Sequence, residues 1–434
     1  MTSSPTYPTD CSFAMLGGMY PSALLEKIEE ASPKTIHYAA NAFQWKLIEG
    51  LESHLERPIY LVDRLFVGTF PDGYKKAWIK RGSFSHVQGS HDDLIGFCNV
   101  KFLRQLTYDM PCMGYLNRWA EHNQDRNRVL FVYASDFSSV AVKFKKRHPD
   151  VHVCLILPDL PMYICAGKQS FAHRLFYRRR VEATLDAAQE LDSFVLLTDH
   201  MKDVLDIDEN KNYVVVEGIA DNFAQKKSSN KSPLDDRPEL RGKRIVAYTG
   251  TLNVEYGIAN LVEAFRKVTQ PEARLLICGA GSGKSCVEDA SRKDPRIIYV
   301  GRISPEEARC VQSEATLLIN PRQRTDEYTK YSFPSKTMEY LASGTPVLCY
   351  KLDGIPDEYD PYLTYIKGDS VRDLAEAIDQ SLSQETRILE RQGKDGRNFV
   401  LSKKNPSSQG KKILSMVFKH CSDSRDERYR IDKR

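Results

Sequence analysis

The sequence lacks the features that would mark a membrane-spanning or secreted protein. It contains no run of 18 consecutive apolar residues, so we expect no spanning helix. Residues 1–22 hold no basic stretch followed by a long apolar one, so we expect no signal peptide. The 10 cysteines include no Cys-x-x-Cys pair, and several lie inside apolar runs. This pattern is typical of reduced thiols, and we expect a cytoplasmic protein.

Signals for metal and for nucleic acid are weak as well. No group of histidines and cysteines has the spacing of a metal site, so we expect no metal. A total of 62 Lys and Arg against 58 Asp and Glu gives a net charge of +4, which is too small to favour nucleic-acid binding. The length of 434 residues and the 41% of hydrophobic residues allow a sizeable core and two or three domains.

The stretch Leu275–Ser285, LLICGAGSGKS, looks like a phosphate-binding loop but has the wrong spacing. A P-loop would need glycine at residue 278, which is Cys278. The alternating glycines 279, 281 and 283 also fail the dinucleotide fingerprint. A strand, a glycine turn and a helix start are what the pattern predicts. Two interpretations stay open: an anion at the helix N-terminus, or a tight turn with no ligand.

Short apolar runs alternate with amphipathic segments along most of the chain. Near-continuous apolar strands between helices are typical of parallel sheets covered on both faces. The repeated strand–helix order predicts an α/β protein built from doubly wound, Rossmann-like domains. The predicted strands are residues 11–16, 59–63, 129–134, 151–157, 194–198, 213–217, 244–249, 274–278, 296–300, 315–320 and 345–350.

A polar segment with two prolines, residues 226–243, divides the chain and predicts a linker or an exposed insertion. It separates an N-terminal α/β domain over residues 1–225 from a second over residues 244–400. A helix is expected over residues 405–420, and the charged residues 421–434 are typical of a disordered tail. The apolar face of that helix carries Ile413, Leu414, Val417 and Phe418.

The segment YSFPSKTMEYLASGTPV, residues 331–347, carries the clearest candidate site. Ser332 or Ser335 can cap a helix that starts near Phe333, with Pro334 in its first turn. The N–H groups around Ser335, Lys336 and Thr337 then form an anion site, to which the lysine adds charge. Glu339 lies about one turn further on. It can accept from the ribose hydroxyls of a nucleoside diphosphate, or it can merely complement the helix dipole.

Several segments resemble family-four retaining glycosyltransferases with the GT-B fold. FPSKTMEYLASGTPVL is similar to their donor-site segment, YTGTLNVEYGIANLVEAF to the first strand–loop–helix of their donor domain, and LLICGAGSGK to the next strand and glycine turn. VGRISPEEARCVQSEATLLINP resembles the segment that closes over the base. GGMYP, PDLPMY and LLTDHM in the first half, and NPSSQGKKIL near the C-terminus, resemble a subgroup that builds surface polysaccharides such as capsule.

This resemblance implies two Rossmann-like domains facing a central cleft, with the C-terminal helix packed back on the first domain. It implies a retaining, metal-independent transferase of hexosyltransferase type that needs no cofactor. The co-substrate would be a UDP- or GDP-linked sugar, and the acceptor a glycan or a lipid-linked oligosaccharide. The catalytic candidates are Gly18, Asp159, Lys336 and Glu339. The donor-binding candidates are Gly250, Thr251, Gly279, Gly281, Arg302, Ile303, Tyr331, Phe333, Ser335, Lys336, Thr337 and Glu339.

The sequence departs from the family pattern at three positions. Tyr331 stands where the family has its first glutamate, and Thr251 and Tyr256 replace the usual Arg and Lys that hold the diphosphate. Phosphate binding would then fall to other cations, with Lys336 first and Arg324 and Lys330 next. Two alternatives stay open: a non-catalytic glycan-binding or scaffold protein, and a nucleotide-sugar epimerase of GT-B architecture.

The segment KQSFAHRLFYRRR, residues 168–180, combines aromatic and basic side chains. It can be an edge that touches anionic lipid at the inner face of a membrane, or an ordinary helix with extended arginines.

Overall fold

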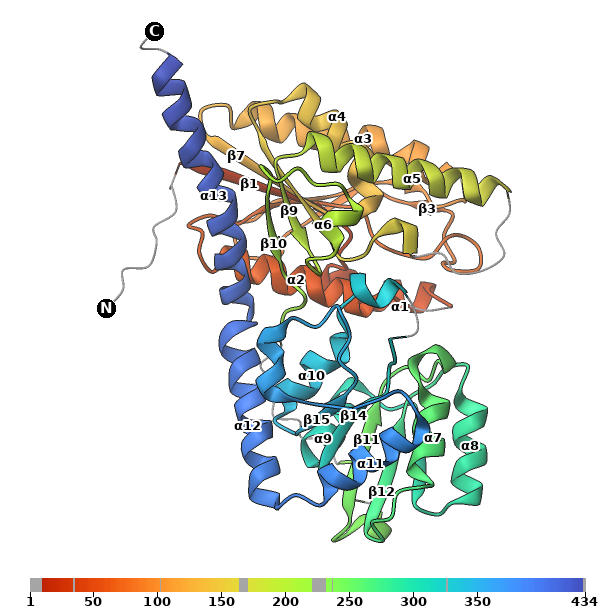
Figure 1. Cartoon of the computed structure of the whole chain (residues 1–434). Helices are drawn as coiled ribbons and strands as arrows, with labels where there is room; N and C mark the ends of the chain where they lie inside the picture. The colour runs from red at the N-terminus through yellow and green to blue at the C-terminus, as the bar shows by residue number, and fades with distance from the viewer. Residues whose placement is uncertain are drawn as a thin grey trace. The chain divides into compact units, whose positions relative to one another are not determined.

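The computed structural model describes residues 10–33, 36–101, 103–163, 171–220, 232–235, 237–324 and 327–431. The chain divides into two compact units. The first unit combines the chain up to Ile219 with the segment from Pro406 onward, and the second unit is Ala220–Asn405. Figure 1 shows the elements of both.

The first unit is built on an eight-stranded sheet in the order β10-β9-β8-β7-β1-β2-β5-β4, in which only β4 runs antiparallel to its neighbour. Its core is formed by strands that are buried along almost their whole length, as in β7 and β8. The strands are β1 (Cys11–Gly17), β2 (Tyr60–Asp63), β4 (Gly82–Phe84), β5 (Asp92–Leu94), β7 (Asn127–Tyr133), β8 (His152–Leu157), β9 (Ser193–Leu196) and β10 (Asn212–Val215), and β3 (Trp78–Ile79) and β6 (Phe97–Cys98) form a separate pair. The helices are α1 (Leu25–Ala31), α2 (Tyr38–Glu52), α3 (Leu103–His122), α4 (Ser138–Arg147), α5 (Phe171–Glu190), α6 (Met201–Val204) and α13 (Pro406–Ile431), with 3-10 turns η1 (Ser22–Leu24), η2 (Ser135–Phe137) and η3 (Pro161–Tyr163).

The last helix, α13, belongs to the first unit and lies against α2 in Figure 1. The two helices meet closely at Gly50, where an added Cβ would lie 2.1 Å from the carbonyl oxygen of Pro406. Ile413, Leu414 and Val417 are fully buried in the core of this unit. The helix continues to Ile431, so its backbone extends through most of the segment that we expected to be a disordered tail.

The second unit holds a six-stranded, fully parallel sheet in the order β13-β12-β11-β14-β15-β16. Serine capping boxes start α9, at Ser304, and α11, at Ser370. The strands are β11 (Arg244–Thr249), β12 (Ala273–Cys278), β13 (Ile297–Gly301), β14 (Leu317–Asn320), β15 (Val347–Cys349) and β16 (Leu363–Tyr365). The helices are α7 (Ile258–Phe265), α8 (Lys284–Lys293), α9 (Pro305–Glu314), α10 (Ser335–Ser343), α11 (Val371–Leu382) and α12 (Thr386–Lys403), with 3-10 turns η5 (Pro238–Leu240), η6 (Val254–Tyr256), η7 (Glu327–Tyr331) and η8 (Asp357–Tyr362).

All eleven strands that the sequence predicts are confirmed, each within two residues at either end. The doubly wound α/β architecture is confirmed in both sheets. The short strands β3–β6 and β16 were not predicted. Within the expected linker, residues 226–231 and residue 236 lie outside the described residues, whereas Ser232 and Leu240 are buried rather than exposed.

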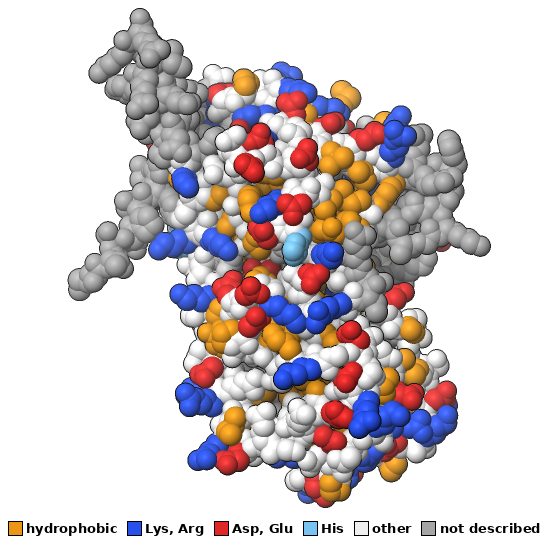
Figure 2. All heavy atoms as spheres, viewed as in Figure 1, with side chains coloured by type: hydrophobic (Ala, Val, Ile, Leu, Met, Phe, Trp, Pro, Cys, Tyr) orange, Lys and Arg blue, Asp and Glu red, His pale blue; other side chains and the backbone are white. Residues whose placement is uncertain are grey.

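Both signs of charge are spread over the face shown in Figure 2, as the small net charge of the chain implies.

Candidate functional site

The candidate site lies at the carboxyl edge of the second sheet. The chain builds β11, β12 and β13 in one direction and then crosses to β14, on the other side of β11. β11 and β14 are therefore the two strands between which the strand order reverses. In parallel α/β sheets, ligands bind outside the carboxyl ends of the strands at such a switch point. The loops after Thr249 and Asn320 frame this position.

Helix α10 points its N-terminus at this edge without a side-chain cap. The helix begins at Ser335, Pro334 is the N-cap residue, and no side chain accepts from the first turn. The prediction that a serine caps the helix is therefore wrong. Ser332 instead accepts a hydrogen bond from Arg322 Nη2 at 3.2 Å, and Ser335 is exposed. The uncapped N–H groups of the first turn can receive an anion.

A hydrogen-bonded network holds the two charged residues of α10. Lys336 Nζ lies 2.8 Å from Glu339 Oε2, and Gln312 Nε2 donates to Glu339 Oε1 at 2.7 Å. Gln312 also donates to Thr249 Oγ1 at 2.8 Å and is fully buried, with its own Oε1 left without a partner. The Lys336 and Glu339 side chains are 37% and 30% exposed. The carboxylate is thus fixed in place and retains lone pairs for a ligand hydroxyl.

Glu339 is the fifth residue of α10, and the first turn of this helix contains no acidic residue. Interactions with the helix dipole fall off within the first turn. The alternative in which Glu339 only complements the dipole is therefore weakened by the position at which the helix begins.

The glycines of the stretch LLICGAGSGKS allow two loops to pack backbone against backbone. An added Cβ at Gly279, whose φ is 147°, would lie 1.8 Å from the carbonyl oxygen of Gly250. Gly250 N donates to Cys278 O, and Leu252 N donates to Ala280 O, each at 2.9 Å. The loops after β11 and β12 thereby extend the pairing of the strands that precede them.

Gly250 also lies beside the charged pair of α10. A Cβ built on Gly250 would be 3.5 Å from Lys336 Cε, so the lysine stem passes close to the end of β11. Thr251 is exposed, and its carbonyl accepts from the Tyr248 hydroxyl at 2.7 Å. An added Cβ on Gly281 would meet the backbone of Leu252 at 2.6 Å.

Two of the predicted donor-binding side chains point into the protein. Phe333 is 5% exposed and its ring packs 5.3 Å from that of Tyr359. Thr337 is fully buried and its hydroxyl accepts from Asn320 Nδ2 at 3.2 Å. Core packing and a strand end therefore occupy both side chains, and the donor-binding roles of Phe333 and Thr337 stay predictions that would involve their backbone groups.

The remaining predicted donor residues lie in the loops of the same edge. Arg302 is exposed and Ile303 half-buried, in the short connection from β13 to α9, the helix that carries Gln312. Tyr331 is half-buried at the end of η7. No hydrogen bond or ion pair within the described residues joins Arg302 or Ile303 to Glu339.

The sequence analysis missed Arg322 and Gln312. Arg322 follows β14 by two residues, and its guanidinium stacks over the rings of Tyr256 and Tyr328, 5.6 and 4.8 Å from their centroids. Arg322 could have been recognised in the sequence as a basic residue directly after the end of a predicted strand. Gln312 carries no local signal, because only the packing of α9 brings it to Glu339. The other expected cations, Arg324 and Lys330, are exposed.

In the first unit, Gly18 follows the end of β1. Its N–H donates to Gln44 Oε1 at 2.9 Å, and an added Cβ would lie 2.0 Å from the Phe66 ring. The glycine is thus explained by packing, and its N–H is already engaged. Asp159 is exposed, two residues after the end of β8. Catalytic roles for Gly18 and Asp159 stay predictions.

Next to Gly18, the same edge holds a buried charge cluster. Arg64 is 3% exposed, pairs with Asp136 at 2.9 Å and lies over the ring of Tyr108 at 4.5 Å. Burial raises the pKa of the neighbouring Asp63 well above its usual value, although its Oδ1 accepts from Met19 N at 2.7 Å.

Metal, disulfide and membrane features were searched over the described part of the chain. It contains no cluster of three or more His, Cys, Asp or Glu that could hold a metal ion. The cysteines Cys11, Cys98, Cys112, Cys154, Cys278, Cys286, Cys310 and Cys349 form no disulfide. None of its helices has the length and hydrophobicity needed to cross a bilayer. Of the basic segment 168–180, residues 168–170 and the side chains of 171–176 lie outside what the structure describes.

Comparison with known proteins shows what the chain is similar to. Residues 232–399 match the model of the family described as glycosyl transferases group 1. A D-inositol 3-phosphate glycosyltransferase of Corynebacterium efficiens is 30% identical over 145 residues, which cover 29% of this chain and 33% of that protein. The match therefore spans about a third of that relative's length.

Solved structures are similar over nearly the whole chain. A sucrose-phosphate synthase from Thermosynechococcus elongatus has a TM-score of 0.63 and 14% identity, covering 95% of this chain and all of that one. A trehalose-6-phosphate structure from E. coli, bound with UDP-2-fluoro glucose, has a TM-score of 0.63 and 8% identity, covering 94% and 99%. The chain therefore has the GT-B fold, and its residues 232–399 are similar to the glycosyl transferases group 1 family.

Proposed function

We propose that the protein transfers a sugar from a nucleotide-diphosphate donor to a glycan or lipid-linked glycan acceptor, with retention at the anomeric carbon. One observation carries this proposal. The uncapped start of α10, Lys336 and the fixed carboxylate of Glu339 occupy the switch point of a parallel sheet in a glycosyl transferases group 1 domain. Anion-binding groups beside a hydroxyl acceptor match the chemistry of a nucleoside diphosphate.

The diphosphate would be held by the N–H groups of α10, Lys336 and Arg322. In the related family, basic residues stand at the positions of Thr251 and Tyr256. The stacking of Arg322 on the Tyr256 ring places a positive charge beside one of those positions. A neighbouring strand end thus supplies a cation near the place where the family's lysine is missing, which favours a working donor site over a lapsed one.

Glu339 would accept from the ribose hydroxyls. Its partners, Lys336 and Gln312, are both hydrogen-bond donors, so they hold the carboxylate in place. When a diphosphate binds, the ammonium of Lys336 can turn from Glu339 toward the phosphate. The pair would then hold the empty site in order and separate when the donor enters.

The principal catalytic effect would be stabilisation of the departing diphosphate by fixed dipoles and cations. The acceptor hydroxyl would attack the anomeric carbon from the face that the diphosphate leaves and pass its proton to an oxygen of that diphosphate, so no separate general base is required. We propose that Gly18 and Asp159, at the carboxyl edge of the first sheet, serve the acceptor side. Work in surface-polysaccharide synthesis, in the cytoplasm or at the inner face of a membrane, is the role that the sequence resemblance favours.

The decisive experiment incubates the full chain with a panel of UDP- and GDP-linked sugars and measures release of UDP or GDP. Slow hydrolysis of one donor, reduced in Glu339→Gln, supports the proposal. Tight nucleotide binding by calorimetry with no release from any donor, with or without glycan acceptors, supports the scaffold alternative. Conversion of the sugar without nucleotide release would support an epimerase.

We also propose that this site works with neither metal nor cofactor, because Lys336, Arg322 and the helix N-terminus supply the positive charge. EDTA should therefore leave donor hydrolysis within about twofold of the untreated rate, less than 0.5 kcal/mol in barrier. Complete loss of activity that Mg²⁺ or Mn²⁺ restores would contradict this part of the proposal.

A further inference from the structure

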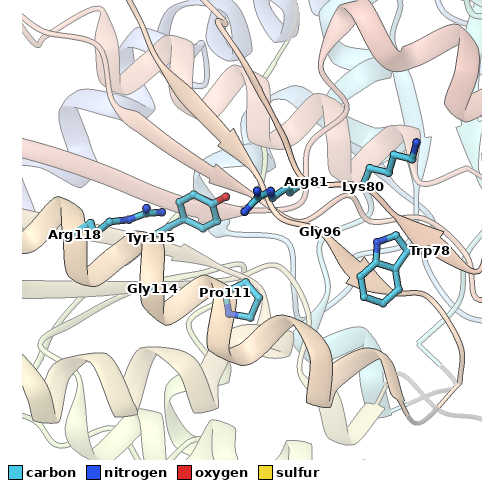
Figure 3. A pocket seen from close by; sticks show the side chains of 8 residues that line it. All are labelled: Trp78, Lys80, Arg81, Gly96, Pro111, Gly114, Tyr115 and Arg118. Atoms are coloured by element: carbon cyan, nitrogen blue, oxygen red, sulfur yellow. The ribbon is translucent and has the colours of Figure 1, made fainter.

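A hollow lies in the first unit, on residues that take no part in the proposed donor site. It has a cavity volume of about 810 Å³, within the range of small-molecule pockets. In Figure 3, Trp78, Lys80 and Arg81 come from the segment around β3, and Tyr115 and Arg118 come from the facing helix α3. The pocket belongs entirely to one unit and therefore forms within that unit alone.

Its lining combines two aromatic rings with three cations. Trp78 is 58% exposed. Tryptophan side chains are on average largely buried, so this exposure is unusual. Within the described residues, Lys80, Arg81 and Arg118 form no ion pair with a carboxylate. Arg118 instead lies over the Tyr115 ring, 4.6 Å from its centroid. Among the residues that the structure describes, the cations of this pocket thus have no acidic partner.

The floor of the pocket is open because α3 carries a glycine there. A Cβ built on Gly114 would meet no atom within 4 Å. Glycine in a helix interior costs about 1 kcal/mol relative to alanine, so this position lowers helix stability while it widens the hollow. A larger side chain at position 114 would therefore fill the pocket without removing any of its charged or aromatic side chains.

These groups fit a ligand that has both a flat apolar face and negative charge. Indole and phenol rings can cover the C–H face of a sugar ring, and their polar edges can bond its hydroxyls. Arginine forks match carboxylate and phosphate oxygens, and lysine adds a point charge. We propose that this pocket binds an acidic oligosaccharide whose sugar rings lie on Trp78 and on Tyr115, at the two ends of the pocket, and whose acid groups lie at Lys80, Arg81 and Arg118. The site is independent of the proposed transferase activity.

An anionic membrane is the competing partner. Leu106 and Met110 of α3 are 73% and 81% exposed, and apolar side chains beside basic ones also bind lipid surfaces. The saccharide is favoured because the rings and cations line a concave hollow, whereas Leu106 and Met110 lie outside it. A membrane contact would depend on the protruding residues and would tolerate a filled pocket.

The test measures binding of trigalacturonate, maltotriose and vesicles of phosphatidylcholine with phosphatidylglycerol to the full chain, by calorimetry and tryptophan fluorescence. We expect trigalacturonate to bind with an affinity that falls as salt rises, and maltotriose to bind at least about tenfold more weakly. Gly114→Leu should abolish trigalacturonate binding, and Trp78→Ala and Arg118→Gln should each weaken it about tenfold.

Matched controls are Leu106→Ala, an exposed apolar residue of the same helix, and Arg178→Gln, an arginine that is 79% exposed on α5. Both should bind trigalacturonate as wild type does, and so should Glu339→Gln, which separates this pocket from the donor site. Equal binding of trigalacturonate by Gly114→Leu, or no binding by wild type, would overturn the proposal. Vesicle binding that Leu106→Ala impairs and Gly114→Leu leaves intact would assign the surface to a membrane instead.

Discussion

The two units place charged groups at the same part of a parallel sheet but use them differently. At the carboxyl edge of the first sheet, Arg64 is buried, paired with Asp136 and enclosed by aromatic rings. At the carboxyl edge of the second sheet, Lys336 and Glu339 remain partly exposed beside an uncapped helix. The first edge pairs its buried arginine with an aspartate of the same unit, whereas the second keeps partly exposed donors and acceptors for a ligand. Similar topology therefore does not imply a similar site, and the difference lies in what covers the strand ends.

The largest effect should come from Arg64. Replacing it with methionine leaves Asp136 with Arg180 alone, 3.0 Å away, and removes the charge that offsets buried Asp63. Breaking a buried pair costs about 3–5 kcal/mol of unfolding free energy. Chemical denaturation would measure it. Lys143→Met is the control, because its pair with Asp109 is exposed and should contribute less than about 1 kcal/mol. Equal effects of the two variants would contradict the assignment of Arg64 to the core.

The next effect concerns His86, held between Asp92 at 2.7 Å and Glu52 at 2.9 Å. Burial alone would lower the pKa of His86, but the hydrogen bonds to Asp92 and Glu52 outweigh it and raise the pKa from 6.5 to about 9. Since the folded pKa exceeds the unfolded one, the stabilisation is complete below pH 6.5 and is lost as pH rises through 9, by about 3 kcal/mol.

Denaturation at pH 6 and at pH 9.5 would measure this loss. His86→Gln should remove most of the difference between the two values. A pH dependence that survives in His86→Gln would assign it to another group.

Glu339→Ala should act mainly on binding. If the carboxylate bonds the ribose, each charge-assisted bond contributes about 1.5–3 kcal/mol, so the Kd for UDP or GDP should rise about tenfold or more. The variant also removes one of the two acceptors to which the buried Gln312 amide donates, while the hydrogen bond to Thr249 remains. We therefore expect the free energy of unfolding to fall by about 1 kcal/mol. Calorimetry and thermal melts on the same variant separate the two effects. Unchanged affinity with lower stability would make Glu339 a structural residue.

Arg322→Gln should weaken UDP binding about fivefold, near 1 kcal/mol, and leave uridine binding unchanged. The comparison of UDP with uridine isolates the phosphate contact that we propose. Arg391→Gln, at an arginine of α12 whose side chain is 85% exposed, is the matched control. Equal losses for uridine and UDP would place Arg322 at the nucleoside or in the fold instead.

The smallest effect is expected for Lys284→Ala. Lys284 opens α8, is 54% exposed, and pairs with Glu288 on the same helix, 3.4 Å away. Nucleotide-sugar affinity should stay within about threefold, under 0.7 kcal/mol. ATP hydrolysis that disappears in this variant would show that the stretch LLICGAGSGKS is a phosphate-binding loop after all.

The fold was predictable because its long strands are buried on both faces and read as continuous apolar runs, such as VHVCLIL and RLLIC. The strands β3 to β6 were not predictable, because they have two or three residues each and include Gly82, Asp92 and Asp93. Periodicity needs a longer window than these segments offer.

The site was predictable where chemistry and local spacing coincide, as for Lys336 and Glu339, three residues apart on one helix face. It was not predictable where the burial of a side chain determines whether a ligand can reach it. Phe333 and Thr337 share the motif but turn inward, and Gln312 reaches Glu339 only through the packing of α9. Adjacency in sequence identified the right segment, and the three-dimensional packing determined which of its side chains are available.

The return of α13 to the first unit makes that unit discontinuous in the chain. During synthesis, residues 413–417 emerge after every residue of the second unit, yet Ile413, Leu414 and Val417 complete the core of the first. The N-terminal domain usually folds first as the chain emerges. Here the first unit can be completed only after the second unit has been synthesised. The second unit can fold completely while the first unit still exposes the surface of α2 against which α13 packs. If synthesis stops before residue 413, the first unit lacks part of its core and stays incompletely folded, although most of it was synthesised first.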